Sequence, residues 1–260
     1  MDWALKKCVI LDMDGTIYLG HIPIAGAVGF IRERWQDLDF FFCSNNTSKS
    51  PQSYVDKLRG MGIPAQPEHL LSPVTPLVDF LREGGIRRAY PVGNADFRKD
   101  LSGRMPELTL TEDAAQAVIL AYDTELTYEK LARSALLLQK PEVLFLATHP
   151  DVVCPSPEGP LPDAGSMASL YATATGRRPQ RIFGKPDPAI LAPLLRRYRR
   201  EEMVMVGDRL STDKRLAENA GIDFVLVLSG EAGPDDLRKE ERRPALVLAD
   251  LGEARRFWPH

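Results

Sequence analysis

The chain alternates short apolar runs with amphipathic stretches, and this alternation restricts the folds open to it. Residues 9–11 and 39–43 have the character of strands, whereas residues 25–35 and 50–61 carry helical periodicity. The same order of runs returns between residues 188 and 248. Strands joined through helices pair in parallel and are covered on both faces. The sequence therefore predicts an α/β protein built on parallel sheets.

Residues 75–183 continue the alternation but lack polar motifs at the ends of their predicted strands. Such motifs gather before residue 50 and after residue 183. The motif-free block is on the order of a hundred residues long, which is the size of a domain. We therefore predict that residues 1–74 and 184–260 form one unit and that residues 75–183 form a second unit inserted into it.

Composition argues against two classes of partner. A net charge of -3 disfavours a nucleic-acid partner, because phosphate contacts favour a basic surface. No run approaches the ~20 apolar residues that span a bilayer, and no secretory cleavage signal is evident, so no membrane partner is expected. The three cysteines are odd in number and form no C-x-x-C pair. This pattern favours a reducing cytoplasm over a disulfide framework or a zinc ribbon.

The most informative motif follows the first apolar run. Asp12 and Asp14 stand two residues apart where the strand is predicted to end, the edge at which α/β sheets hold their chemistry. Two like charges so close imply a cation, a shared proton or solvent. An EF-hand loop would need an oxygen ligand, a glycine and a glutamate where Thr16, Ile17 and Pro23 stand. A plain aspartate–glycine turn is the other alternative. We interpret the pair as a Mg²⁺ site built around a nucleophilic aspartate.

Two neutral or cationic motifs follow other apolar runs. Ser44, Asn45 and Asn46 offer a hydroxyl and two amides, which can bind phosphate oxygens without a fixed charge. The alternative is a turn that tolerates left-handed backbone. Lys185 stands between a glycine and a proline, where its ammonium can neutralise an oxyanion or a carboxylate. Its alternative is a solvent-exposed lysine in a turn.

Asp208 and Asp213 add carboxylates at a later predicted strand end. Both can serve one cation, the first directly and the second through water. Asp213 can instead interact with a helix N-terminus, a role that Ser211 and Thr212 could share.

In their order along the chain, Asp-x-Asp-Gly-Thr, Ser-Asn-Asn, Gly-Lys-Pro and Gly-Asp-x-x-x-x-Asp resemble the four motifs of the haloacid dehalogenase (HAD) superfamily of aspartyl phosphotransferases. The place of the middle block and the segments 147–151 and 165–177 resemble the NagD-type subfamily, class IIA, which includes 4-nitrophenylphosphatases. The resemblance covers nearly the whole chain. It implies a Rossmann-like parallel sheet core with an inserted α/β cap domain that covers the site and selects the substrate.

The resemblance assigns the chemistry to the carboxylates. Asp12 would attack phosphorus and become the aspartyl phosphate, while Asp14 would protonate the leaving alcohol and then activate water. Mg²⁺ would be held by Asp12, by the backbone carbonyl of Asp14 and by Asp208, with Asp213 behind them.

The resemblance also assigns the binding of the phosphoryl group. Ser44, with Asn45 and Asn46 beside it, would bind that group, and Lys185 would offset its charge. This division of labour agrees with phosphoryl transfer in general, where positioning and charge neutralisation carry most of the catalysis. The resemblance further allows a homodimer formed through the cap.

Two positions depart from the family pattern, and both lie in the predicted cap. Members often have Asn where His149 stands, and commonly Gly where Asp163 stands. The departures bear on substrate choice rather than on the chemistry. His149 and Asp151 are our candidates for contacting the substrate, and a hydrogen-bonded structural histidine is the alternative for His149.

The sequence thus predicts a Mg²⁺-dependent phosphomonoester hydrolase that acts on a small phosphorylated metabolite. A phosphotransferase or phosphomutase of the same superfamily is one alternative. A non-catalytic phospho-ligand-binding module is another, although such a module has no use for a leaving-group acid at Asp14. Sugar phosphates, nucleotides, phosphoglycolate and pyridoxal phosphate all fit as substrates.

Overall fold

The computed structural model describes residues 1–156 and 158–258, which divide into two units. The core unit comprises Met1–Ser44, Gln52–Leu71 and the residues from Lys185 onward. The inserted unit comprises Asn45–Pro51 and Ser72–Gly184. The segment Asn45–Pro51 thus groups with the inserted unit, although the sequence prediction placed it in the first unit.

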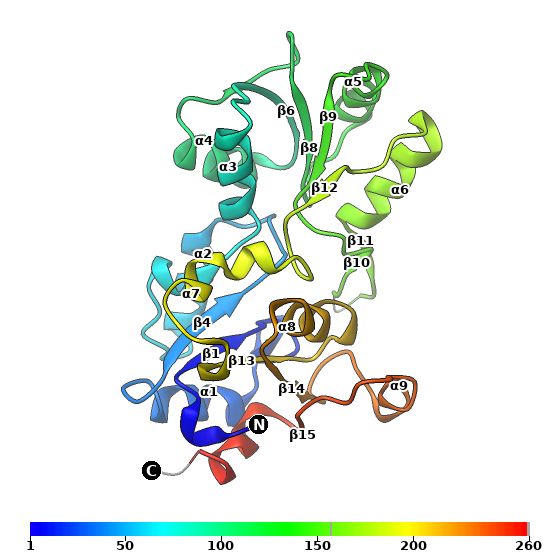
Figure 1. Ribbon diagram of the computed structural model, residues 1–260. Helices are drawn as coiled ribbons and strands as arrows, with labels where there is room; N and C mark the ends of the chain where they lie inside the picture. Colours follow the sequence, from blue (N-terminus) through cyan, green and yellow to red (C-terminus); the bar gives the residue numbers. More distant parts are fainter. Residues whose placement is uncertain (157, 259–260) are drawn as a thin grey trace. The chain divides into compact units, whose positions relative to one another are not determined.

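The core unit is built on a six-stranded parallel sheet of order β15-β14-β13-β1-β4-β5 (Figure 1). Its strands are β1 (Cys8–Leu11), β4 (Asp39–Cys43), β5 (Leu70–Leu71), β13 (Met203–Gly207), β14 (Asp223–Val227) and β15 (Leu246–Leu248). Because β1 lies between β4 and β13 in parallel register, the carboxyl ends of all three strands meet at one edge of the sheet.

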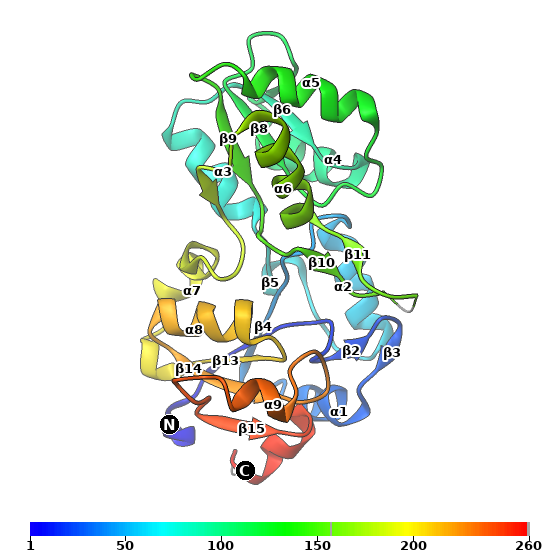
Figure 2. The ribbon, with the colours of Figure 1, turned by 90° about the vertical axis from the view of Figure 1, so that its right-hand side faces the viewer.

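Side-chain alternation along the buried strands creates two apolar faces. In β1, Val9 and Leu11 point to one face and Cys8 and Ile10 to the other, and all four are fully buried. The first face packs against α1 (Ala25–Glu33), α2 (Pro51–Gly60) and the 3₁₀ turn η6 (Leu251–Arg256). The second packs against the 3₁₀ turn η3 (Pro188–Leu191), α7 (Ala192–Leu195) and α8 (Arg215–Ala220). Figure 2 shows α8 and the short α9 (Pro234–Leu237) beside β13, β14 and β15.

Two predicted helices of the core unit differ in the structure. The helix expected over residues 188–199 is the turn η3 followed by α7, which ends at Leu195. Pro193 has no amide hydrogen to donate to the preceding turn, so the α-helical hydrogen bonds are interrupted where η3 meets α7. The helix expected over residues 211–220 begins as a π-helical turn, η5 (Leu210–Lys214), and becomes α-helical only in α8.

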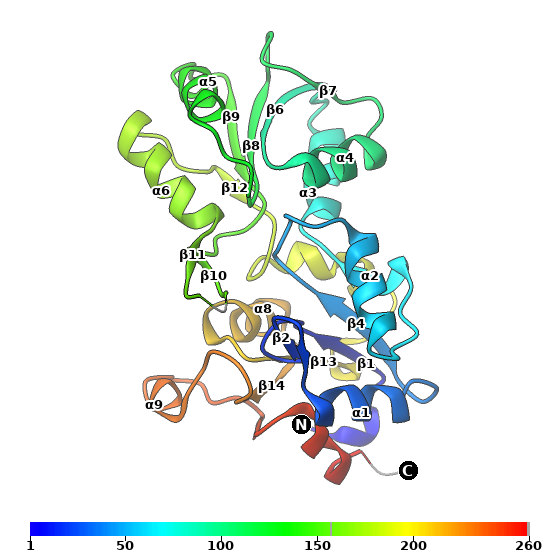
Figure 3. The ribbon, with the colours of Figure 1, turned by 180° about the vertical axis from the view of Figure 1, so that it is seen from behind.

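The inserted unit has its own five-stranded parallel sheet of order β12-β9-β8-β6-β7 (Figure 3). Its strands are β6 (Arg88–Val92), β7 (Thr109–Leu110), β8 (Ala117–Leu120), β9 (Leu144–Ala147) and β12 (Arg181–Ile182). α3 (Val74–Glu83) and α4 (Ala95–Arg104) cover one face, and α5 (Tyr128–Leu138) and α6 (Ala164–Thr175) cover the other.

The remaining elements are short. Two hairpins are formed by β2 (Tyr18–Leu19) with β3 (Ile22–Pro23) and by β10 (Val153–Cys154) with β11 (Leu161–Pro162). Three 3₁₀ turns are η1 (Trp3–Leu5), η2 (Pro67–His69) and η4 (Arg200–Glu202). Within residues 1–156 and 158–258, every helix is too short or too polar to span a lipid bilayer.

Candidate active site

The ends of three neighbouring strands bring the core motifs together. Asp12 follows β1 and its amide donates to Val206 O at 2.9 Å, so the sheet ladder extends to this residue. Ser44 follows β4, and its amide donates to Leu71 O at 3.1 Å. Asp208 follows β13 directly. The predicted strand-end motifs of the core unit therefore lie along one edge of the sheet.

Three buried carboxylates converge at this edge. Oxygens of Asp12, Asp208 and Asp213 all lie within 4.8 Å of one another. The buried ammonium of Lys185 contacts Asp12 and lies 2.6 Å from Asp213 Oδ1. Lys185 is therefore not the solvent-exposed lysine that the sequence also allowed. The cluster has more carboxylates than ammonium groups, which suits an added cation.

Burial and charge set the protonation of this cluster. Burial alone would lower the pKa of Lys185, but the carboxylates of Asp12 and Asp213 raise it well above its ordinary value, so the ammonium stays charged. Burial, reinforced by the carboxylates of Asp12 and Asp213, raises the pKa of Asp208. Burial also raises the pKa of Asp213, against the opposing effect of Lys185. A divalent cation would favour the ionised forms, so the donor set fits a metal such as Mg²⁺.

Two glycines let the backbone approach the carboxylates closely. Gly15 has a φ of +89°, a conformation that favours glycine, and a Cβ there would collide with the side chain of Asp208. At the end of β13, a Cβ on Gly207 would collide with Asp213.

Asp208 is held from two sides, since Oδ2 accepts the amide of Glu231 at 2.7 Å and Oδ1 accepts the hydroxyl of Thr16 at 3.4 Å.

Asp213 accepts a backbone amide at the start of a helical turn, which is one of the two roles that its sequence context suggested, and it also pairs with Lys185. It lies in the π-helical turn η5, where Oδ2 accepts the amide of Arg209 at 3.1 Å, while Oδ1 faces Lys185. The hydroxyl Oγ1 of Thr212 is buried without a hydrogen-bond partner among the described residues, so it does not serve as the cap considered from the sequence. A π-helical turn is a frequent feature of functional sites.

Asp14 is more exposed to solvent than Asp12, although neighbouring groups partly enclose its carboxyl. Burial of its carboxyl raises its pKa, while a hydrogen bond from the amide of Gly20 and the charge of Lys57 act in the opposite direction. The Gly20 amide lies 3.5 Å from Asp14 Oδ1. Lys57 also donates to Gly20 O at 2.7 Å and lies over the ring of Tyr18, so it holds the hairpin β2–β3 beside Asp14. A carboxyl that keeps its proton to higher pH is suited to general-acid chemistry.

Lys57 and Thr16 were not selected from the sequence. Thr16 stood within the first motif and could have been chosen as a hydroxyl donor to a carboxylate. Nothing in the helical pattern of residues 50–61 distinguished Lys57 from an ordinary surface lysine.

The other predicted site residues lie in the inserted unit. Asn45 Nδ2 donates to both carboxylate oxygens of Asp151, at 3.3 and 3.2 Å. Asn46 Oδ1 accepts the amide of Ser48 at 2.9 Å and its hydroxyl at 2.7 Å, which forms a side-chain turn without the left-handed backbone considered from the sequence.

His149 and Asp163, the two departures from the family pattern, are in contact with each other. Nε2 of His149 lies 2.9 Å from Asp163 Oδ1, and Nδ1 lies 2.8 Å from the hydroxyl of Thr148. Both His149 and Asp163 are buried, with exposed fractions of 1% and 3%. Asp163 Oδ1 also accepts the amide of Ala164 at 2.6 Å and thereby caps α6. These contacts are those of the structural histidine that the sequence left as an alternative.

Replacing one member of this pair is expected to cost more than replacing both. His149→Asn alone leaves the buried carboxylate of Asp163 without its ring partner, and we expect it to lower the free energy of unfolding by ~2–3 kcal/mol. Adding Asp163→Gly removes that carboxylate and keeps an acceptable helix cap, so the double variant should recover ~1 kcal/mol or more. Chemical denaturation of both single variants and the double variant measures the coupling. Strictly additive effects would show that the two departures are independent.

The pKa shift of Asp208 predicts how the metal-free protein responds to pH. Its pKa rises above the ordinary 3.8 on folding, so the folded state retains a proton that the unfolded chain releases above about pH 4. The contribution of this proton to the free energy of unfolding is fully present below about pH 4, and it is lost as the pH rises through the pKa of Asp208 in the folded state. In EDTA, the melting temperature of the wild type should therefore fall relative to that of Asp208→Asn between about pH 5 and about pH 8. If the difference in melting temperature between the two proteins did not change with pH, the raised pKa of Asp208 would be contradicted.

Comparisons with known proteins agree with this fold. Residues 9–104 match the family described as haloacid dehalogenase-like hydrolase, and residues 182–254 match a family described as HAD-hydrolase-like. An acid sugar phosphatase of Staphylococcus haemolyticus is 32% identical over 95% of both chains.

Solved structures give the same result. A 4-nitrophenylphosphatase from Thermotoga maritima has a TM-score of 0.91 and 37% identity, covering 98% of both chains. NagD from Escherichia coli has a TM-score of 0.85 and 26% identity, covering 97% of this chain and 98% of its own. A glycerol phosphate phosphatase from Mycobacterium tuberculosis, solved in complex with magnesium, has a TM-score of 0.83 and 29% identity, covering 93% of this chain and 74% of its own.

A parallel α/β core with acidic residues at adjoining strand ends defines a phosphatase of the HAD type. Within that class, the chain belongs to the NagD-like phosphatases of class IIA. The fold class and the enzyme class predicted from the sequence are confirmed.

Proposed function

We propose that the protein is a Mg²⁺-dependent phosphomonoesterase that works through an aspartyl phosphate on Asp12. The observation that carries this proposal is the Asp12 carboxylate, which is buried at the end of β1 and paired with Lys185. Asp208 and Asp213 lie beside it and are held by backbone amides. A fixed carboxylate with a charged ammonium next to it is oriented for attack, while the ammonium offsets charge on an incoming phosphoryl group.

Asp12 and Asp14 divide the bond making and bond breaking. A carboxylate oxygen of Asp12 attacks phosphorus as the ester P–O bond breaks, and the departing alkoxide takes the proton of Asp14. Asp14, now ionised, removes a proton from a water molecule that attacks the acyl phosphate. The Asp12–phosphate bond then breaks, which releases phosphate and restores the carboxylate. The raised pKa of Asp14 supports its first role, since the acid must hold its proton until the leaving group needs it.

We propose that Mg²⁺ is held by Asp12, by Asp208 and by the backbone carbonyl of Asp14. Asp213 lies behind these groups. Bound there, the ion supplies Lewis-acid stabilisation of charge on the phosphoryl oxygens. Carboxylate and carbonyl oxygens are the donors that Mg²⁺ prefers, and the three buried carboxylates need a cation to be ionised together.

We infer that Ser44, Asn45 and Asn46 bind the phosphoryl oxygens. Their hydroxyl and amide groups can donate without adding charge. Asp151 remains our candidate for contacting the rest of the substrate, because its carboxylate is already placed against the Asn45 amide. Since the ring of His149 is enclosed by Thr148 and Asp163, we propose that it supports this loop rather than contacting the substrate.

Small phosphorylated metabolites are the proposed substrates, with sugar phosphates first in rank because acid sugar phosphatases are among the relatives. A cytoplasmic location, a homodimer through the inserted unit and the absence of nucleic-acid or membrane partners stay predictions.

Phosphate release from a panel of esters tests the proposal. The purified protein with Mg²⁺ should hydrolyse 4-nitrophenyl phosphate and show a preference among hexose phosphates, glycerol phosphate, phosphoglycolate, pyridoxal phosphate and nucleotides. Transfer of the phosphoryl group to an added alcohol in preference to water would favour the phosphotransferase alternative. Binding of these esters without any turnover would favour the non-catalytic module.

A further inference from the structure

The segment that follows Ser44 is held by the inserted unit through two buried contacts. Thr47 Oγ1 accepts the amide of Tyr122 at 3.1 Å, and Ser48 O accepts Nδ2 of Asn94 at 2.7 Å. Because Asn46 binds the amide and hydroxyl of Ser48, the position of Ser48 also sets that of the Asn46 side chain. The conformation of the proposed phosphate-binding amides therefore depends on residues that precede α4 and follow β8.

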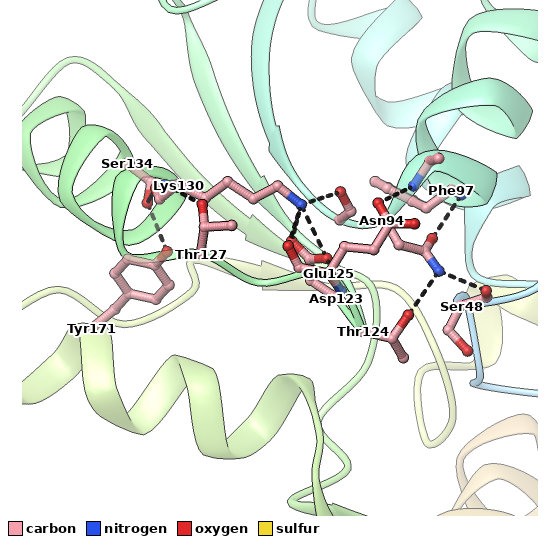
Figure 4. A network of polar contacts seen from close by, with 12 residues as sticks. Ser48, Asn94, Phe97, Asp123, Thr124, Glu125, Thr127, Lys130, Ser134 and Tyr171 are labelled. Atoms are coloured by element: carbon pink, nitrogen blue, oxygen red, sulfur yellow. Dashed lines mark hydrogen bonds and ion pairs between the residues drawn. The ribbon is translucent and has the colours of Figure 1, made fainter.

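Asn94 and Tyr122 lie at a special point of the inserted sheet. α4 leaves β6 toward β7, whereas α5 leaves β8 toward β9, so the connections diverge between the neighbouring strands β6 and β8. In open α/β sheets the crevice at such a point is the usual ligand site. Here Asn94, Asp123 and Lys130 take part in a network of polar contacts at these strand ends (Figure 4).

Lys130 fixes the two strand ends to each other. Its ammonium donates to Asp123 Oδ2 at 2.8 Å, to Glu125 O at 3.0 Å and to Gly93 O at 3.3 Å. The side chain of Asp123 is fully enclosed, so this ion pair is shielded from water. Gly93 immediately precedes Asn94, which means that Lys130 also restrains the backbone that carries Asn94.

The carboxamide of Asn94 has two separable functions. Oδ1 accepts the amide of Phe97 at 3.0 Å and caps α4, a purely structural role. Nδ2 donates to Ser48 O and, at 3.2 Å, to Thr124 Oγ1. Only the nitrogen reaches the segment that carries Asn45 and Asn46, so a substitution can remove one function and keep the other.

We propose that Asn94 is a positioning residue for the phosphate-binding segment Asn45–Ser48, acting through its bond to Ser48 O. This inference rests on the proposed function of Asn45 and Asn46. Without the bond, the segment would populate other conformations, and phosphate would bind only the fraction in which the amides are in place. The smaller population of this conformation lowers the affinity for substrate and for product alike. KM should therefore rise while kcat stays nearly unchanged.

Asn94→Ser and Asn94→Asp test the proposal, since each keeps an oxygen that can cap α4 and removes the donor to Ser48. We expect Asn94→Ser to raise KM and the inhibition constant of inorganic phosphate together by ~3–10-fold, the scale of one lost hydrogen bond, with little change in kcat. Asn94→Asp should act in the same direction and more strongly, because its carboxylate faces the carbonyl of Ser48. Amide hydrogen exchange in peptides covering Asn45–Pro51 should accelerate in both variants.

Gln116→Ala is the matched control. Gln116 Oε1 accepts the amides of Arg87 and Arg88, so this side-chain amide also binds the backbone, but at the amino ends of β6 and β8 and away from Asn45–Pro51. It should lower the melting temperature without changing KM or exchange in Asn45–Pro51. If Asn94→Ser left both KM and exchange unchanged in an active enzyme, the positioning role would be wrong. A wild-type protein that hydrolyses no phosphate ester would instead contradict the proposed function, while the exchange data would still decide whether Asn94 orders the segment.

Discussion

Asp12→Asn is expected to reduce turnover of 4-nitrophenyl phosphate by ~10⁴-fold or more, the scale of loss when a covalent nucleophile is removed. The amide oxygen of Asn cannot form a stable acyl phosphate, whereas the shape of the side chain is conserved. The fold should persist, because the substitution removes one of three mutually repelling carboxylates and leaves Lys185 in contact with Asp213. In EDTA, the melting temperature should be equal to or higher than that of the wild type.

Borohydride trapping gives an independent readout of the same step. Reduction of an acyl phosphate during turnover should convert Asp12 to homoserine in the wild type and leave Asp12→Asn unmodified. Asp39→Asn is the control, because Asp39 begins β4 at the amino ends of the core strands, away from the site. This variant should keep full activity. Label on another carboxylate, or substantial turnover by Asp12→Asn, would require a different nucleophile.

Removal of divalent cations is expected to reduce turnover by ~10³-fold or more, which corresponds to several kcal/mol of charge stabilisation. Without a cation, the raised pKa of Asp208 keeps that carboxyl protonated to higher pH and the cluster incompletely charged. Mg²⁺ should restore activity after dialysis against EDTA. Ca²⁺ should not, because its larger and looser coordination shell misplaces the attacking carboxylate.

Asp208→Asn separates a metal effect from a general salt effect. This variant should lose the increase in melting temperature that Mg²⁺ confers on the wild type, since ligand binding to the folded state alone stabilises it. The wild type should show no comparable increase with an equal ionic strength of NaCl. Full activity of the wild type in excess EDTA would rule out the proposed metal site.

The core part of the site was predictable from the sequence because strand ends are local features. Asp12, Ser44 and Asp208 each follow a short apolar run, and parallel pairing is enough to place the ends of such runs at one edge. Lys185 was less determined, since a lysine before a proline is compatible with an exposed turn. The resemblance of the motif order to a known family assigned its role, and the structure shows it buried against Asp12 and Asp213.

The contacts of the inserted unit were less predictable because they join residues distant in sequence with no shared local pattern. His149 and Asp163 were each noticed as departures from a family pattern, yet nothing in the sequence indicated that they touch. Asn45–Pro51 groups with the inserted unit and contacts Asn94, Tyr122 and Asp151, which are all distant from it in sequence. The sequence predicted that the block of residues 75–183 has α/β character, but it did not predict the helices α3 and α6.

The strand order of the core sheet has a consequence for synthesis of the chain on the ribosome. β1 is made first, but one of its two neighbours, β13, begins at Met203, almost two hundred residues later. Until then, one edge of an apolar strand has no partner, and unpaired apolar edges are sites of aggregation. The long run Ser72–Gly184 of the inserted unit is complete before β13 emerges and contains a sheet of its own. In nascent chains stalled before residue 203, the inserted unit should therefore be folded while β1 still lacks one of its partner strands. Such chains should depend on chaperones more than the finished protein does.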